Sequence, residues 1–102
     1  MDTMVRGLFL GFIKVHILHH AAREPVYGLW LIEELGRHGY ALSPGTLYPI
    51  LHALEEAGYV KAEGKNVNGK RRKYYKTTAR GTRALTVATK RVQELLNEIL
   101  ED

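Results

Sequence analysis

Seven of the fifteen lysine and arginine residues lie between residues 61 and 76, and Glu63 is the one carboxylate among them. This segment carries a net charge of +6, whereas the whole chain of 102 residues carries only +4. Cations concentrated in one short segment can displace counterions from phosphates, so the pattern indicates an anionic partner such as nucleic acid. A solvated basic loop would have the same composition, and the neighbouring elements must decide between the two interpretations.

A second group of polar residues occupies the run from Ser43 to Pro49. Ser43 is a favourable N-cap and Pro44 suits a first helical position, so a helix is expected to begin here. Hydroxyl groups and the free N–H groups of a helix start can bind phosphates or several base edges. Since the run lacks Arg, Lys, Asn and Gln, we expect it to set register and read shape. The alternative is that Ser43 and Thr46 only cap the helix.

The third group, His16, His19 and His20, has the spacing of metal ligands on one helix face. No Asp, Glu or Cys lies beside these histidines in the sequence, so no metal and no cofactor are expected. Exposed or dimer-facing histidines with a mild response to pH are the preferred interpretation. A metal- or pH-responsive regulator remains an alternative.

Other chemistry is not indicated by the sequence. The chain has no cysteine, which excludes a disulfide scaffold, a cysteine zinc site and a thiol nucleophile. We find no nucleophile with a base, no phosphate-cradling glycine loop and no converging carboxylates, so the protein is not expected to be an enzyme. Lys14 and His16 interrupt the apolar stretch 5–18, and neither a membrane span nor a signal peptide is predicted. The absence of cysteine suits a cytoplasmic protein.

The first two elements predicted from apolar spacing are helices. Residues 5–21 are apolar around most of a helix circumference, and Pro25 ends this helix. A second helix over residues 27–37 is predicted to bury a stripe formed by Leu29, Ile32 and Leu35, with Glu33 and Glu34 facing outward. Gly36 and Gly39 are expected to stop it.

A third helix and a β-hairpin follow. Leu47, Ile50, Leu51 and Leu54 recur at helical spacing until Gly58. Residues 59–63 and 73–77 have strand-forming residues, and the Asn68-Gly69 pair between them favours a tight turn. Tyr74 and Tyr75 must point to opposite faces of the second strand, and the sequence leaves open which of them faces a ligand. A hairpin placed directly after a helix-turn-helix is a wing.

The last helix is predicted to begin at the cap Thr78 and to reach Leu100. Its apolar residues are separated by alternating steps of three and four, which is a heptad seam that could pack on another subunit or on its own. These seam residues are Leu85, Ala88, Val92, Leu95 and Ile99. We expect a mainly α fold with a small β-hairpin: a winged helix-turn-helix DNA-binding domain (1–77) and a C-terminal dimerisation helix (78–102). Leu8 and Phe12 of the first helix are expected to join the dimer interface.

Three motifs together resemble the PadR family of transcriptional regulators: Tyr27-Gly28, the run Gly45-Thr46-Leu47-Tyr48-Pro49, and Arg72-Lys73-Tyr74-Tyr75. The similarity covers roughly residues 5–85. It implies a winged-helix homodimer that represses transcription at a pseudo-palindromic operator, often relieved by a small molecule. The single C-terminal helix resembles the short subfamily. No aromatic residue follows Tyr75, so a flat ligand stacked between aromatic residues of that helix is not expected.

The resemblance also implies which residues contact double-stranded DNA. These are Ser43, Gly45, Thr46, Tyr48 and Pro49 in the helix and Lys70, Arg71 and Arg72 in the wing. The positions of Pro44, Asn66, Asn68 and Tyr74 in the same two elements add them to the expected set. The alternative from a different class is a winged-helix protein-interaction module without DNA binding.

Overall fold

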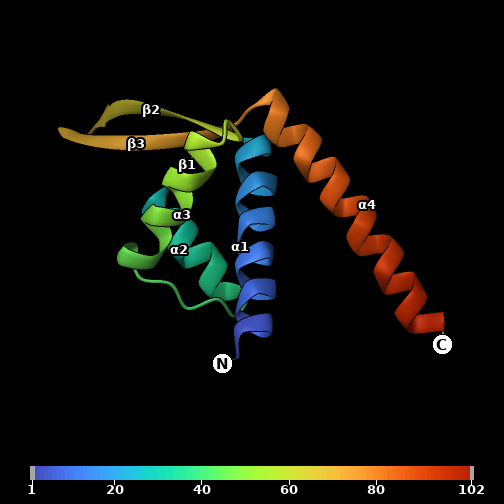
Figure 1. The fold of residues 1–102 in the computed structure, drawn as a ribbon. Helices are drawn as coiled ribbons and strands as arrows, with labels where there is room; N and C mark the ends of the chain where they lie inside the picture. Colours follow the sequence, from blue (N-terminus) through green and yellow to red (C-terminus); the bar gives the residue numbers. More distant parts are fainter. Residues whose placement is uncertain (1, 102) are drawn as a thin grey trace.

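The computed structural model describes residues 2–101 and contains four helices and three strands in that range (Figure 1). The elements are α1 (Thr3–Arg23), β1 (Val26–Tyr27), α2 (Gly28–Arg37), α3 (Pro44–Glu56), β2 (Val60–Val67), β3 (Lys70–Thr77) and α4 (Ala79–Glu101). The expected order of three helices, a hairpin and a last helix is confirmed. Met1 and Asp102, the outer ends of the two expected domains, lie outside the described residues.

The sheet is antiparallel with the order β1-β3-β2. β2 and β3 pair from Val60 opposite Thr77 to Val67 opposite Lys70. Asn68 and Gly69 form the turn with φ angles of 52° and 78°, the left-handed conformation that an Asn-Gly hairpin turn requires. The strands are longer than the sequence predicted, because each satisfies the other's backbone hydrogen bonds up to the turn even where the residues are charged.

Strand β1 was not predicted from the sequence. It consists of two residues, Val26 and Tyr27, which pair with Tyr75 and Tyr74 of β3. Two residues are too few to show a period-two pattern, so only the tertiary structure reveals this strand. Its effect is to place the start of α2 directly beside the hairpin.

The second helix differs in rotation from the prediction. Gly28, Leu31 and Leu35 face the core, whereas Leu29 is 57% exposed. Glu34 was expected to face outward, but its side chain is only 12% exposed and lies toward α1. Because β1 fixes where the helix begins, the core-facing stripe is set by steps of three and four from Gly28. The prediction based on Leu29 was therefore wrong.

One hydrophobic core lies between α1, α2, α3 and the inner face of the sheet. All four apolar residues predicted for α3 are buried. The Thr77 hydroxyl donates to the Leu18 carbonyl oxygen at 2.8 Å and joins β3 to α1 inside this core. The buried residues are Ile13, Ile17, Leu18, Ala21, Val26, Leu31, Leu35, Leu47, Ile50, Leu51, Leu54, Val60 and Tyr75.

Helix α4 is joined to the core at its first turn. The N–H of Gly81 donates to the Thr78 hydroxyl at 3.0 Å, so the predicted cap is confirmed. A β-carbon at Gly81 would overlap the Tyr59 carbonyl oxygen, so only glycine allows this close approach. Beyond this turn α4 diverges from α1, and Gly81 is the one buried residue within 79–101 (Figure 1). No helix within residues 2–101 is long and apolar enough to cross a membrane.

Candidate nucleic-acid interface

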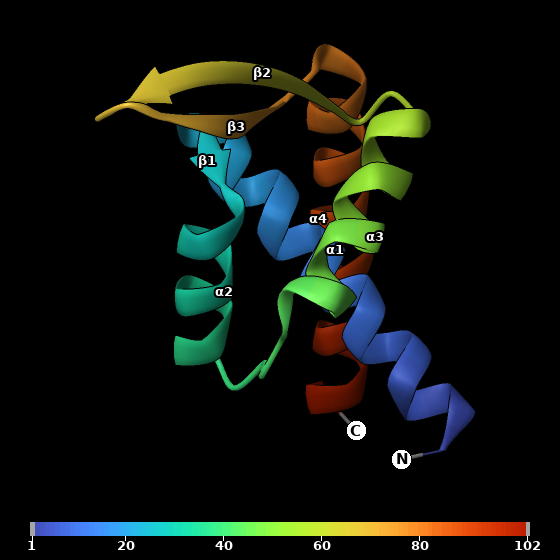
Figure 2. The ribbon, with the colours of Figure 1, turned by 90° about the vertical axis from the view of Figure 1, so that its left-hand side faces the viewer.

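The first turn of α3 and the tip of the β2–β3 hairpin project from the same side of the molecule. This side is on the left in Figure 1 and faces the viewer in Figure 2. α4 leaves the fold on the opposite side in Figure 1. A helix start and a hairpin tip presented together are the arrangement with which winged helices meet a duplex.

The first turn of α3 is exposed. Within the described chain, the Ser43 hydroxyl makes no hydrogen bond to the helix backbone, and its contact is the Thr46 hydroxyl at 3.3 Å. The interpretation that Ser43 only caps the helix is therefore not supported. Gly45 and Pro49 are exposed beside this pair. The turn presents hydroxyl groups without any charged side chain.

Tyr48 of α3 packs against the first residue of α2. A β-carbon at Gly28 would lie 2.7 Å from the Cζ atom of Tyr48 and would also overlap its hydroxyl oxygen. Gly28 therefore provides the space in which the Tyr48 ring lies, and this contact explains why the Tyr27-Gly28 motif accompanies Tyr48. The Tyr48 residue remains 38% exposed on the projecting side.

The two tyrosines of β3 lie on opposite faces of the sheet. Tyr75 is fully buried in the core, and Tyr74 is half-buried on the outer face. Burial raises the pKa of Tyr75, and its hydroxyl has no hydrogen-bond partner among residues 2–101. Tyr75 therefore cannot reach a ligand, and Tyr74 is the tyrosine available on the hairpin.

The inner face of the hairpin is the face that continues toward α3. By strand alternation, Arg71 and Lys73 share this face with Tyr75. The Lys73 Nζ lies 3.8 Å from a Glu55 carboxylate oxygen of α3. The Arg71 guanidinium lies over Gly64, where a β-carbon would come within 2.8 Å of its Cζ. Arg71 is thus a cation on the α3 side of the hairpin with no carboxylate opposite it.

The outer face carries the remaining cations and two half-buried aromatic rings, Tyr27 and Tyr74. The Arg72 guanidinium carbon lies 4.0 Å from the centre of the Tyr27 ring, a close cation–π contact. Lys65 Nζ lies 5.5 Å from the centre of the Tyr74 ring. The expected wing residues therefore do not form one cluster. Arg71 and Asn66 share the inner face, Asn68 lies in the turn, and the outer face holds Lys70, Arg72 and Tyr74.

An apolar groove of about 460 Å³ separates α1 from α4. It is lined by four of the residues expected at a dimer interface: Phe12, Leu85, Ala88 and Val92. The other three, Leu8, Leu95 and Ile99, are exposed. The heptad seam therefore packs on its own chain only at its beginning. Its later residues are more exposed, with Leu95 at 53% and Ile99 at 59%.

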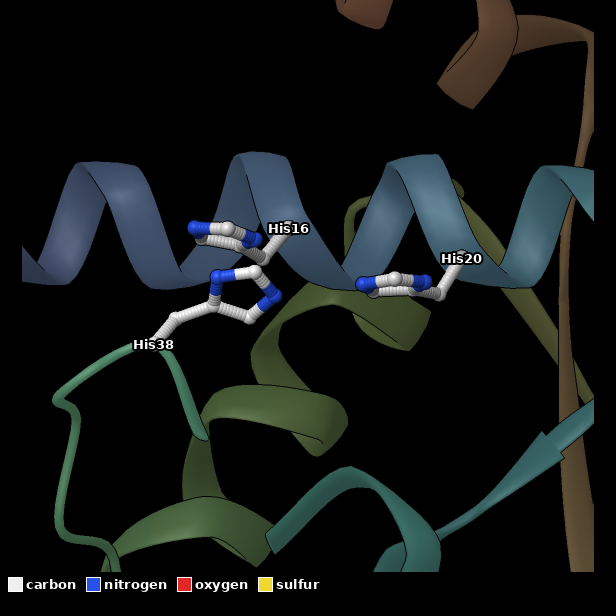
Figure 3. A group of neighbouring side chains, drawn as sticks. All are labelled: His16, His20 and His38. Carbon is white, nitrogen blue, oxygen red and sulfur yellow. The ribbon is translucent and has the colours of Figure 1, made fainter. Parts of the chain in front are cut away.

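The histidines assemble differently from the sequence pattern. His16 and His20 lie together, and the third member of the group is His38 at the end of α2 (Figure 3). His19 is exposed and does not belong to this group. A carboxylate, Glu34, lies beside these rings, although the sequence showed no acidic neighbour.

Four residues of these sites were missed by sequence reasoning. They are Tyr27 under Arg72, Glu55 beside Lys73, and Glu34 and His38 beside the α1 histidines. Each is brought to its partner by tertiary packing, which residue spacing cannot show. Only the spacing of four between Glu34 and His38 could have signalled their pairing within one helix.

Comparisons with known proteins agree with this geometry. The model of the transcriptional regulator PadR-like family matches residues 17–87. The transcriptional regulator Rv3488 of Mycobacterium tuberculosis (strain ATCC 25618 / H37Rv) is 49% identical over 88 residues, which are 86% of this chain and 82% of the relative.

Solved structures share the whole fold. A PadR family transcriptional regulator from Eggerthella lenta DSM 2243 is 34% identical with a TM-score of 0.81, covering 97% of this chain and 88% of that one. The protein smu.1704 from Streptococcus mutans UA159 is 32% identical with a TM-score of 0.77, covering 87% and 86%. The chain is therefore a transcriptional regulator rather than an enzyme, and it belongs to the PadR-like family.

Proposed function

We propose that this regulator is a homodimer that binds double-stranded DNA and represses transcription at a pseudo-palindromic operator. The observation that carries the proposal is the joint projection of an uncharged, hydroxyl-bearing helix start and a hairpin of net charge +6 from one side of the fold. In the proposed complex, the first turn of α3 enters a major groove and the hairpin tip lies over the adjacent minor groove. Residues 1–77 form the DNA-binding domain and residues 78–102 the dimerisation helix.

The two elements have different roles in this proposal. The hairpin contributes most of the affinity, because its cations neutralise phosphates and release counterions. The start of α3 sets register through Ser43, Thr46 and the exposed edge of Tyr48, and it discriminates bases only modestly. Gly45 lets the backbone approach the duplex closely. We therefore expect an affinity that is strongly dependent on salt and an operator preference that depends partly on DNA shape.

The part of α4 that is exposed in the single chain supports the proposed dimer. Six apolar side chains of this helix are exposed in the single chain: Val87, Val92, Leu95, Leu96, Ile99 and Leu100. Exposed apolar side chains in this number on one helix are typical of a protein interface. In the proposed dimer, α4 of a second copy covers this surface together with the exposed part of α1, including Leu8. The two-fold axis would then present two α3 helices to successive half-sites about 34–36 Å apart.

We assign a small-molecule effector to the groove between α1 and α4. In the single chain this groove measures about 460 Å³, the size of a ligand site, and an effector would occupy the part that the second copy leaves uncovered. A molecule bound there would contact the dimer helix and α1 at once. It could therefore alter the spacing of the two α3 helices and release the operator. Because DNA is the proposed ligand, we expect the protein in the cytoplasm.

The proposal is tested by removing the cations of the hairpin tip. The triple variant Lys70→Ala, Arg71→Ala, Arg72→Ala should bind all duplexes more weakly. The slope of log affinity against log salt should fall by about 0.9 for each phosphate contact that is lost. The measurement is fluorescence anisotropy on duplexes selected from genomic fragments by the purified protein.

A matched control variant also removes three positive charges, but from α4 instead of the hairpin. Arg83, Lys90 and Arg91 are exposed on α4, and their triple alanine variant should retain the affinity and most of the salt slope. Unchanged binding by the Lys70, Arg71, Arg72 variant would contradict the role of the hairpin. If the wild-type chain shows no salt-dependent duplex binding, the fold serves as a protein-interaction module instead.

A further inference from the structure

A cluster of three imidazoles joins α1 to the end of α2 (Figure 3). One nitrogen atom of each of His16, His20 and His38 lies within 4.8 Å of the other two. The His16 and His20 rings, one helical turn apart on α1, are nearly parallel with centres 6.2 Å apart. The His38 ring lies beside that of His16, with its centre 4.9 Å away. Three ligand-type side chains from two elements therefore face one small volume.

A carboxylate completes this group. One oxygen of Glu34, Oε2, accepts a hydrogen bond from His38 Nε2 at 3.0 Å and lies 3.5 Å from His20 Nε2. The other oxygen, Oε1, accepts from Arg37 Nη1 at 3.0 Å. Arg37 therefore holds the carboxylate with Oε2 directed at the histidines. The Glu34 side chain is largely covered, so this orientation is not that of a free surface residue.

We propose that His16, His20, His38 and Glu34 form a binding site for one divalent transition-metal ion of the Zn²⁺ class. Imidazole suits Zn²⁺, Co²⁺, Ni²⁺ and Cu²⁺, and three imidazoles with one carboxylate make a four-coordinate N₃O set. At Zn–N distances of about 2.0–2.1 Å, tetrahedral ligation brings the nitrogen atoms to about 3.3 Å from one another. The three nitrogen atoms, up to 4.8 Å apart, must therefore move closer on binding, and His38 is the exposed member that can rotate. The ion then replaces the ring proton that His38 donates to Glu34.

The protonation states favour an ion at this place. Burial lowers the pKa of both His16 and His20, with a further contribution from neighbouring histidines, so their rings are neutral and able to ligate near neutral pH. The hydrogen bond from His38 lowers the pKa of Glu34, which keeps the carboxylate ionised. The two α1 rings are thus in the neutral state that metal ligation needs.

Aromatic rings surround the cluster and provide a means to observe it. The Trp30 ring lies edge-on to His20 with centres 5.3 Å apart, and the Tyr40 ring lies 5.5 Å from that of His16. Trp30 is the chain's single tryptophan. Any paramagnetic ion bound by His20 would therefore quench the whole tryptophan fluorescence of the protein.

The first experiment titrates untagged, metal-free protein with Co²⁺. We expect quenching of Trp30 and the visible absorption bands of tetrahedral Co²⁺ to saturate together at one ion per chain. Zn²⁺ should displace the Co²⁺ and raise the melting temperature, because an ion that binds only the folded state stabilises it. Saturation at one ion per two chains would mean that the ion bridges copies, and it would overturn the proposal. Absence of binding at micromolar Co²⁺ and Zn²⁺ would overturn it as well.

Single variants locate the site. His38→Gln changes an exposed side chain, 47% accessible, so the fold should survive, and the affinity should fall at least tenfold. Glu34→Gln should weaken binding and shift the Co²⁺ bands. His19→Gln and His52→Gln remove histidines outside the cluster and should bind as the wild type does. Wild-type affinity in His38→Gln, or an equal loss in His19→Gln, would refute the assignment.

Discussion

The winged-helix unit and helix α4 differ in how they bury their apolar side chains. Between Ile13 and Thr77, the chain closes a core of its own, with Tyr75 and Leu51 completely buried. Helix α4 is anchored at Gly81 and then exposes most of its apolar side chains. The exposed part of α4 gains little stability from its own chain, because apolar side chains stabilise a fold only when they are removed from water. The winged-helix unit is therefore complete in one chain, whereas in the proposed dimer α4 is completed only by a second copy.

The substitution with the largest expected effect places a charge in the heptad seam of α4. Leu95→Glu should leave the circular dichroism of the helices largely intact and yield monomers in sedimentation velocity, since Leu95 is 53% exposed in the single chain. Operator affinity should fall about a thousandfold, to the level of non-specific binding, because one half-site remains. A dimer that survives this substitution would place the interface elsewhere.

The anchor of α4 gives the next largest effect. Gly81→Ala places a β-carbon against the Tyr59 carbonyl oxygen and the Thr77 methyl group, and we expect a loss of about 1–3 kcal/mol in the free energy of unfolding. Gly36→Ala on α2 is the matched control, since its β-carbon would meet open space. That variant should be as stable as the wild type or more stable by up to about 1 kcal/mol. Chemical denaturation of both proteins measures the difference.

Within the closed unit, the two faces of the hairpin can be separated. Arg71 lies on the α3 side, whereas Arg72 is stacked on Tyr27 on the outer face. We expect Arg71→Ala to weaken operator binding by roughly tenfold and to reduce the salt slope by about 1. Arg72→Ala should reduce affinity less and lower the melting temperature more, because its cation–π contact is lost. Equal effects on affinity would show that both faces contact the duplex.

The smallest expected change concerns the start of α3. A β-carbon at Gly45 would lie 3.8 Å from the Ser43 hydroxyl oxygen, which is an ordinary contact. Gly45→Ala should therefore keep or slightly raise the free energy of unfolding, by up to about 1 kcal/mol. Operator binding should nevertheless weaken, because in the proposed complex the added methyl group faces the duplex. If stability and affinity both stay at the wild-type value, Gly45 does not lie against DNA.

Much of the fold could be predicted because local signals agreed with one another. The cap at Thr78, the Asn68-Gly69 turn and the apolar spacing of α3 each specify an element without reference to the rest of the chain. The rotation of α2 could not be predicted, because it depends on the two-residue strand β1. A strand of that length has no periodicity and exists only through pairing with β3.

The sites were predictable to a smaller extent. Strand alternation predicts that neighbouring wing residues separate onto two faces, but it does not say which face is turned toward α3. The burial of Tyr75 decides this. The histidine cluster needed tertiary structure, because His38 and Glu34 reach His16 and His20 from another helix. Residue spacing alone selected His19, whose ring lies 5.0 Å from that of His20 but whose nitrogen atoms do not join the group.

The central claim, a winged helix completed as a dimer on DNA, is tested most directly by sedimentation equilibrium of the complex. The protein would be mixed with a duplex selected from genomic fragments, at low salt and again at high salt. We predict a mass equal to one duplex plus two chains at low salt, and dissociation into duplex and protein dimer at high salt. A complex with one chain per duplex, or a free protein that sediments as a monomer at micromolar concentration, would contradict the account.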